Sequence, residues 1–131
     1  MNTRQPLTFD DGLHSFLQTL TAANKSAATR AAYQTDIRQF LLFLSENTLV
    51  AINPAQVVRA DITEYLAHLA ERHLSGLSRA RKLAAIREYF RHLVSTETLA
   101  TNPAATIPTP KKEKKETTFL SRTEYTQILA N

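Results

Sequence analysis

The chain has 131 residues, 43% of them hydrophobic, so it is long enough to bury the core of one domain. Two glycines and no cysteine favour helices over sheets and exclude disulfides and thiolate metal sites. The formal net charge is +4, and no apolar run approaches the roughly 20 residues of a membrane helix, which predicts a soluble cytoplasmic protein without membrane contact.

Two amphipathic helices are predicted in the first part of the chain. Thr8 is a candidate N-cap for the first helix, which ends near Asn24 and repeats apolar residues at helical spacing. Ser26 can cap the second helix, over residues 27–47, and the apolar stripe of that helix extends from Tyr33 to Leu44. Both stripes are expected to face a common core.

Two further helices follow a turn at Pro54. Asp61 or a residue near it is expected to begin the third helix, and Gly76 to adopt a left-handed conformation in the turn after it. Ser78 is the expected cap of the fourth helix. Its apolar stripe consists of Leu83, Ile86, Phe90 and Leu93. Four amphipathic helices with short connections predict an all-α fold, a compact bundle of four helices.

The composition changes after Asn102. Residues 103–118 are rich in proline and lysine and have almost nothing to bury, which indicates an exposed linker. The last segment, FLSRTEYTQILAN, resumes an amphipathic rhythm. The predicted organisation is therefore a helical domain over 1–102, a linker over 103–118 and the start of a further helix, in a truncated C-terminal domain, over 119–131.

Positive charge is concentrated in the C-terminal part of the sequence. Nine of the sixteen basic residues but only four acids lie between residues 79 and 116, a local net charge of +5. On the fourth helix Arg81 is expected to point away from the core, and Arg79 and Lys82 to project past the end of the bundle. Lysine, arginine and hydroxyl groups at the start of the second helix are suited to phosphate oxygens. This distribution favours a polyanionic partner such as DNA.

The residues alone leave two alternatives open. A stand-alone helix-turn-helix regulator would use the third and fourth helices, joined through LSGLS. A helical protein-interaction module would carry the basic face only for solubility. The four histidines lack metal-ligand spacing and no side chain is a good nucleophile candidate, so we expect no catalytic residue, metal or cofactor.

Three motifs occur in a recognisable order. They are S-x-x-T-x-x-x-Y at 26–33 followed by DIRQFLLFL, ADITEYLAHLAERHLS at 60–75, and RARKLAAIREYFRHLVSTETLATNPAATIPTPK at 79–111. Together they resemble the N-terminal core-binding, or SAM-like, domain of the tyrosine recombinase (phage integrase) family, including its Xer-like branch. The resemblance implies a domain that clamps duplex DNA by phosphate and groove contacts, while a C-terminal domain cuts and rejoins the strands through a tyrosine nucleophile.

The resemblance also implies partners and site residues. The partners are double-stranded DNA and, for the full-length protein, other recombinase protomers in a synaptic complex; the fragment itself is expected to be a monomer. Leu13, Phe16 and Leu17 are assigned to the core, although the first helix of this family often packs on a neighbour. Tyr33 is assigned to the core and Tyr125 is not the nucleophile. The positions that match DNA-facing sites are Lys25, Ser26, Thr29, Arg30, Ser78, Arg79, Arg81, Lys82 and Arg87, with Lys111, Lys112, Lys114 and Lys115 of the linker.

Overall fold

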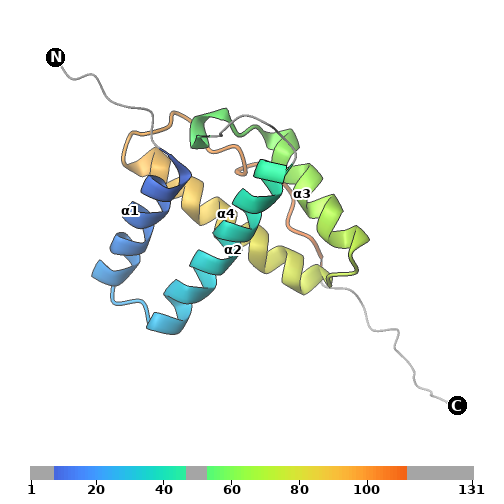
Figure 1. Ribbon diagram of the computed structural model, residues 1–131, viewed down its shortest axis with the longest axis horizontal. Coiled ribbons are helices and arrows are strands. Elements are labelled where there is room, and N and C mark those ends of the chain that lie inside the picture. The colour runs from blue at the N-terminus through green and yellow to red at the C-terminus, as the bar shows by residue number, and fades with distance from the viewer. Residues whose placement is uncertain (1–7, 47–52, 112–131) are drawn as a thin grey trace, which may run out of the picture.

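The fold is an all-α bundle, seen in a computed structural model that describes residues 8–46 and 53–111. The helices are α1 (Phe9–Ala22), α2 (Ala27–Glu46), α3 (Arg59–Glu71) and α4 (Gly76–Ser95), with a short 3-10 turn, η1, at Pro54–Gln56. Figure 1 shows α4 crossing the other three helices, and it packs on each of them. The described ranges contain no strand, so the predicted four-helix bundle is confirmed.

An aromatic cluster fills the place where α1, α2 and α4 meet. The rings of Phe9 and Tyr89 stack with centroids 5.4 Å apart, and Phe40 and Phe90 pack edge-on against Phe9. The Tyr89 hydroxyl is buried and donates to the backbone carbonyl of Phe9 at 3.1 Å, which satisfies the only polar atom of that side chain. This bond also holds the first turn of α1 against α4.

The predicted assignment of α1 to the core is confirmed for its two central residues. Leu13 and Phe16 are buried, and Leu17 packs partly buried against the same cluster. Tyr33 is half-buried and meets Phe16 edge-on at 5.4 Å, so its ring also belongs to the core. The apolar stripes of all four helices therefore converge as helical periodicity requires.

The cap of α4 differs from the prediction. Ser75 is the N-cap, because its Oγ accepts from the backbone N–H of Ser78 at 3.1 Å, and Gly76 is the first helical residue. Ser78 therefore occupies the third helical position rather than the cap. Thr8 caps α1 as predicted, through its bond from the N–H of Asp11.

The helix ends explain why Gly76 has no left-handed role. Three helices end in Schellman motifs, in which the N–H of the second residue after the C-cap bonds to the carbonyl five positions earlier. The corresponding bonds join Lys25 N to Leu20 O, Leu74 N to Leu69 O, and Thr98 N to Leu93 O. The residues in left-handed conformation are Asn24, His73 and Glu97, with φ of 62°, 67° and 64°. The left-handed position after α3 is thus His73, and the prediction for Gly76 is wrong.

Replacing Ser75 by alanine is expected to lower the free energy of unfolding by about 1 kcal/mol, because the N–H of Ser78 loses its acceptor. The matched control is Ser78→Ala, which keeps that N–H and its partner Ser75 Oγ. Urea unfolding followed by circular dichroism measures both variants. An equal or larger loss in Ser78→Ala would contradict Ser75 as the cap.

The chain after α4 is partly integrated into the core. Ala104 is fully buried and Ile107 is 4% exposed, and both belong to the main hydrophobic cluster. The expectation that residues 103–118 have almost nothing to bury is wrong at these two positions. The reason is that the segment folds back onto α4 instead of leaving the bundle, as Figure 1 shows.

Candidate nucleic-acid interface

The start of α2 presents hydroxyl and cationic groups to solvent. Ser26 Oγ accepts from the N–H of Thr29 and donates to Thr29 Oγ1, both at 3.0 Å, so the predicted cap forms. Lys25 is exposed and Arg30 is half-buried. Arg30 Nε is buried without a hydrogen-bond partner in the described part of the chain. This end of α2 therefore combines an N-terminal helix dipole with two cations.

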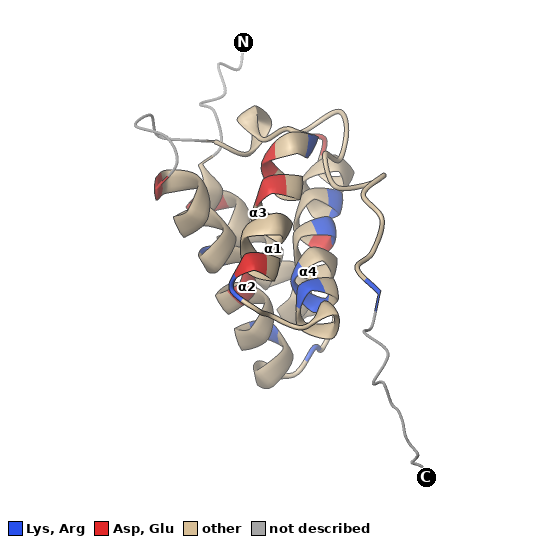
Figure 2. Ribbon diagram, turned by 90° about the vertical axis from the view of Figure 1, so that its right-hand side faces the viewer, with Lys and Arg blue, Asp and Glu red and all other residues tan. Residues whose placement is uncertain are grey.

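The start of α4 carries the second part of the candidate surface. Ser78 is half-buried and its hydroxyl accepts from Ser75 Oγ at 3.2 Å. Arg79 is half-buried as well, and its Nε donates to the carbonyl of Leu74 at 3.2 Å. This hydrogen bond therefore also stabilises the turn that follows α3. Figure 2 shows the basic residues of α4 spread along the helix and reaching this N-terminal end.

Lys82 does not project past the end of the bundle. It is 6% exposed, and its Nζ donates to Asp36 Oδ1 at 2.8 Å and to Gln39 Oε1 at 2.5 Å. Asp36 lies on α2 and is 2% exposed, so the two opposite charges form a buried ion pair. Lys82 precedes Ile86 by four residues and shares its buried face, which is the physical reason for the difference.

Arg81 is placed differently from its neighbour. Its side chain is 62% exposed, yet Nη2 contacts the same Asp36 Oδ1 at 3.2 Å. The sequence analysis did not predict this buried carboxylate, which joins α2 to Arg81 and Lys82 of α4. A guanidinium that is anchored on one side and open to solvent on the other can still bind an anion on its open side.

A crevice between α2 and α4 brings Thr29 and Arg81 together. Its volume is about 230 Å³, and Ala32, Ala84 and Ala85 form its small-residue lining together with Tyr33 and Asp36. Two predicted site residues from helices far apart in sequence thus line one hollow. Because these side chains are small, they leave room for a nucleic-acid strand to approach the two helices.

Arg87 is engaged by the protein itself. Its Nε donates to Ala104 O at 3.2 Å, Nη1 donates to Thr109 Oγ1 at 2.8 Å, and Nη2 donates to Ile107 O. Lys111 is exposed at the end of the described segment. The predicted positions Lys112, Lys114 and Lys115 lie outside the described residues.

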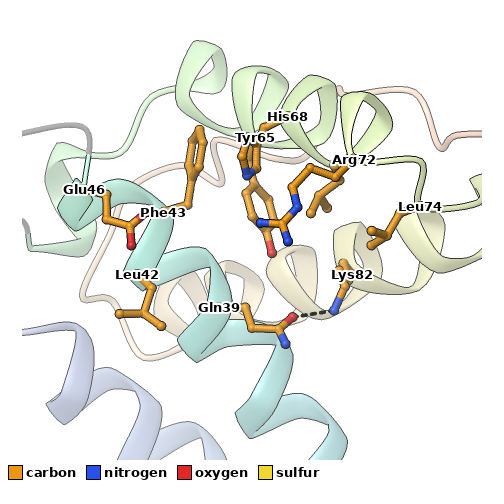
Figure 3. Close-up of a pocket in the computed structure, with 10 residues that line it drawn as sticks. Gln39, Leu42, Phe43, Glu46, Tyr65, His68, Arg72, Leu74 and Lys82 are labelled. Carbon is orange, nitrogen blue, oxygen red and sulfur yellow. Dashed lines mark hydrogen bonds between the residues drawn. The ribbon is translucent and has the colours of Figure 1, made fainter.

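A larger groove, of about 410 Å³, lies between α2, α3 and the start of α4 (Figure 3). Phe43 and Tyr65 line it, and Arg72 reaches over it from the end of α3. Lys82 and Gln39 form one end of the groove through their hydrogen bond. No residue of this groove except Lys82 was predicted as a site residue, because exposed and apolar positions alternate along it without a motif.

The tyrosines of the bundle are held in the neutral form. Burial raises the pKa of Tyr65 to about 12, with a smaller contribution from Asp36, and burial followed by Glu88 raises the pKa of Tyr33. In the described ranges no cluster of three metal-ligating side chains occurs, and no helix is long and apolar enough to cross a membrane.

Comparisons with known proteins identify the family of the chain. Residues 13–97 match the family described as phage integrase, N-terminal SAM-like domain. The tyrosine recombinase XerC of Chlorobaculum parvum is 35% identical over 121 residues, which cover 88% of this chain and 36% of the relative. The tyrosine recombinase XerD of Shewanella oneidensis is 30% identical over 92% of this chain and 40% of the relative.

A solved structure shares the fold. The solution structure of an integrase-like domain from Bacillus cereus has a TM-score of 0.68, covers 91% of this chain and 97% of that domain, and is 18% identical. The chain spans only about a third of the length of the curated relatives it matches. The chain therefore belongs to the tyrosine recombinase family and corresponds to the phage integrase N-terminal SAM-like domain of its members.

Proposed function

We propose that the domain binds the backbone of duplex DNA through the starts of α2 and α4. The single observation that carries this proposal is the crevice lined by both Thr29 and Arg81. It combines a hydroxyl, an anchored but exposed guanidinium and alanines that permit close approach of a phosphate backbone. Lys25 and Arg79 extend the cationic surface on the two helix starts.

Because Lys82 is buried, the proposed surface offers fewer cations to DNA than the sequence predicts. Asp36 neutralises Lys82, and Arg87 directs three of its five N–H donors to backbone and side-chain oxygens of the chain itself. The contacts that remain for phosphates come from Lys25, Ser26, Thr29, Arg30, Ser78, Arg79, Arg81 and Lys111. About four of these charges form the compact surface at the helix starts, so binding by the isolated domain should be modest and strongly dependent on salt.

We further propose that this domain serves a longer recombinase. The relatives are named tyrosine recombinases and are about three times the length of the matched region, so strand cleavage by a tyrosine would belong to a further domain. Tyr33, Tyr65 and Tyr89 do not suit that role, because burial raises the pKa of each and their rings pack in the core. Other protomers would then meet this domain in a synaptic complex on DNA.

The double variant Lys25→Ala/Arg81→Ala is expected to weaken binding to a duplex of about two helical turns roughly 100-fold. Each lost charged contact contributes about 1.5 kcal/mol or more, and a factor of ten corresponds to about 1.4 kcal/mol. Fluorescence anisotropy at several salt concentrations measures the affinity. The slope of log affinity against log salt should fall by about two.

The matched control is Arg38→Ala/Arg91→Ala, which removes the same formal charge from residues paired with Asp10 and Glu88. It should change affinity by less than about threefold, since these cations lie outside the helix starts. Equal losses in the two double variants would show that only net charge matters. A folded native chain that does not bind DNA at low salt would refute the proposal and favour a protein-interaction module.

A further inference from the structure

The segment after α4 is tied down by one residue in the middle of that helix. Three donors of the Arg87 guanidinium are directed to acceptors on Ala104, Ile107 and Thr109. The backbone carbonyl of Arg87 in turn accepts from Asn102 Nδ2 at 3.2 Å. One residue of α4 therefore holds the returning chain both at its start and seven residues later.

Other contacts place the same segment without fixing its far end. The side chain of Asn102 caps the turn by accepting from the N–H of Ala104 at 2.9 Å. Arg59, at the start of α3, donates to Thr106 Oγ1 at 3.1 Å. Past Ile107, the hydrogen bond from Arg87 to Thr109 is the one that lies nearest to Lys111 in the sequence among the described residues. The direction of the last described residues thus depends on Arg87.

That direction leads to the proposed DNA surface. In Figures 1 and 2 the segment runs back along α4 from its C-terminal end towards its N-terminal end. The described part of the segment, of which Lys111 is the last residue, therefore ends near the N-terminal end of α4, and three more lysines follow in the sequence within four residues. If the segment were not held against α4, Lys111 would occupy a wide range of positions relative to that helix.

We infer that Arg87 is a positioning residue that sets where the chain leaves the domain, and that it thereby adds Lys111 to the DNA-binding surface. The second half of this inference rests on the proposed DNA binding. A direct phosphate contact by Arg87 is the competing role. Three of the five guanidinium N–H donors are already directed to Ala104, Ile107 and Thr109, so such a contact would have only the remaining two. A lysine could replace a phosphate ligand, but it could not reproduce this planar, three-acceptor contact.

The absence of cysteine from the sequence permits a direct distance measurement. Spin labels at Glu64→Cys on α3 and Lys111→Cys, both exposed positions, report the direction of the segment by pulsed electron resonance. We expect one narrow distance population in the native background and its loss in Arg87→Gln and Arg87→Lys. Thr109→Val removes one acceptor without touching α4, and we expect it to broaden the distribution less.

Circular dichroism establishes that each variant remains helical. If either Arg87 variant unfolds, the distance distribution of the Thr109→Val variant alone tests the positioning role. An unchanged narrow population in a folded Arg87 variant, or in Thr109→Val where the Arg87 variants unfold, overturns the positioning role. Restoration of the narrow population by Arg87→Lys would also overturn it, because charge alone would then suffice.

DNA binding tests the second half separately. Lys111→Ala should lower the salt slope by about one in the native background and by clearly less in Arg87→Gln. Equal effects in both backgrounds would overturn the link to DNA while leaving the distance result intact. A native chain that binds no DNA would refute the proposed function, and the distance measurement would still decide whether Arg87 directs the segment.

Discussion

Replacing Asp36 by alanine is expected to destabilise the domain by about 3–5 kcal/mol. The substitution leaves Lys82 in a position that is 6% exposed, with Gln39 as its only remaining described acceptor. Removing one partner of a buried ion pair is costly because the other charge stays away from water without compensation. Such a loss is a large share of the 5–15 kcal/mol that holds a typical domain together.

The double variant Asp36→Leu/Lys82→Met separates the two contributions to that cost. Apolar residues of similar volume often replace a buried pair without loss, so this double variant should be far more stable than Asp36→Ala. The matched control on the surface is Glu88→Ala, whose partner Arg91 is 74% exposed in its side chain. It should cost less than about 1 kcal/mol.

Urea unfolding followed by circular dichroism measures all three proteins, since the chain has no tryptophan. A loss in Asp36→Ala no larger than in Glu88→Ala would contradict the buried pair. The double variant also tests the DNA surface, because it frees the guanidinium of Arg81 from its anchor. If anchoring of Arg81 supports phosphate binding, the affinity for DNA should fall while the fold persists.

Helical spacing in the sequence indicates that both members of this ion pair are buried, although composition does not. Lys82 stands four residues before Ile86, and Asp36 stands four residues before Phe40, so helical spacing puts both charges on buried faces. Opposite charges on the inner faces of two helices predict an ion pair only if the helices are known to be neighbours. That knowledge is tertiary, and helices α2 and α4 are separated in sequence by about thirty residues.

The helices themselves were predictable because their apolar residues repeat at helical spacing. Their ends were less so, because capping depends on one or two residues. Both Ser75 and Ser78 are good N-cap candidates, and three left-handed positions are filled by Asn24, His73 and Glu97 without glycine. The Schellman bonds and the packing around them impose these conformations, and residue type alone does not reveal them.

The segment after Asn102 was predicted to be an exposed linker because its average composition is polar, and an average does not reveal single buried residues. Proline and lysine dominate residues 103–118, yet Ala104 and Ile107 are enough to dock its first part. The complement to that docking is Arg87, which in the sequence is one more cation of a basic helix. The predicted boundary at 102 therefore omits residues that the structure joins to the core.

A chain shortened to residues 1–102 is expected to be about 3–5 kcal/mol less stable than one shortened to 1–111. The shorter chain loses the burial of Ile107, which contributes about 1.5–3 kcal/mol. It also loses three acceptors of Arg87, whose hydrogen bonds each contribute about 1 kcal/mol net. The ordering entropy of the released residues offsets part of this sum.

The chain ending at 111 is the matched reference, because it keeps every described contact of the segment. Ile107→Ala in the full chain separates the apolar part and should cost about 2–3 kcal/mol. Equal stability of the 1–102 and 1–111 chains would show that the returning segment adds nothing to the domain. The expected difference would instead place the C-terminal limit of the folded unit after residue 102, within the segment that Arg87 holds as far as Thr109.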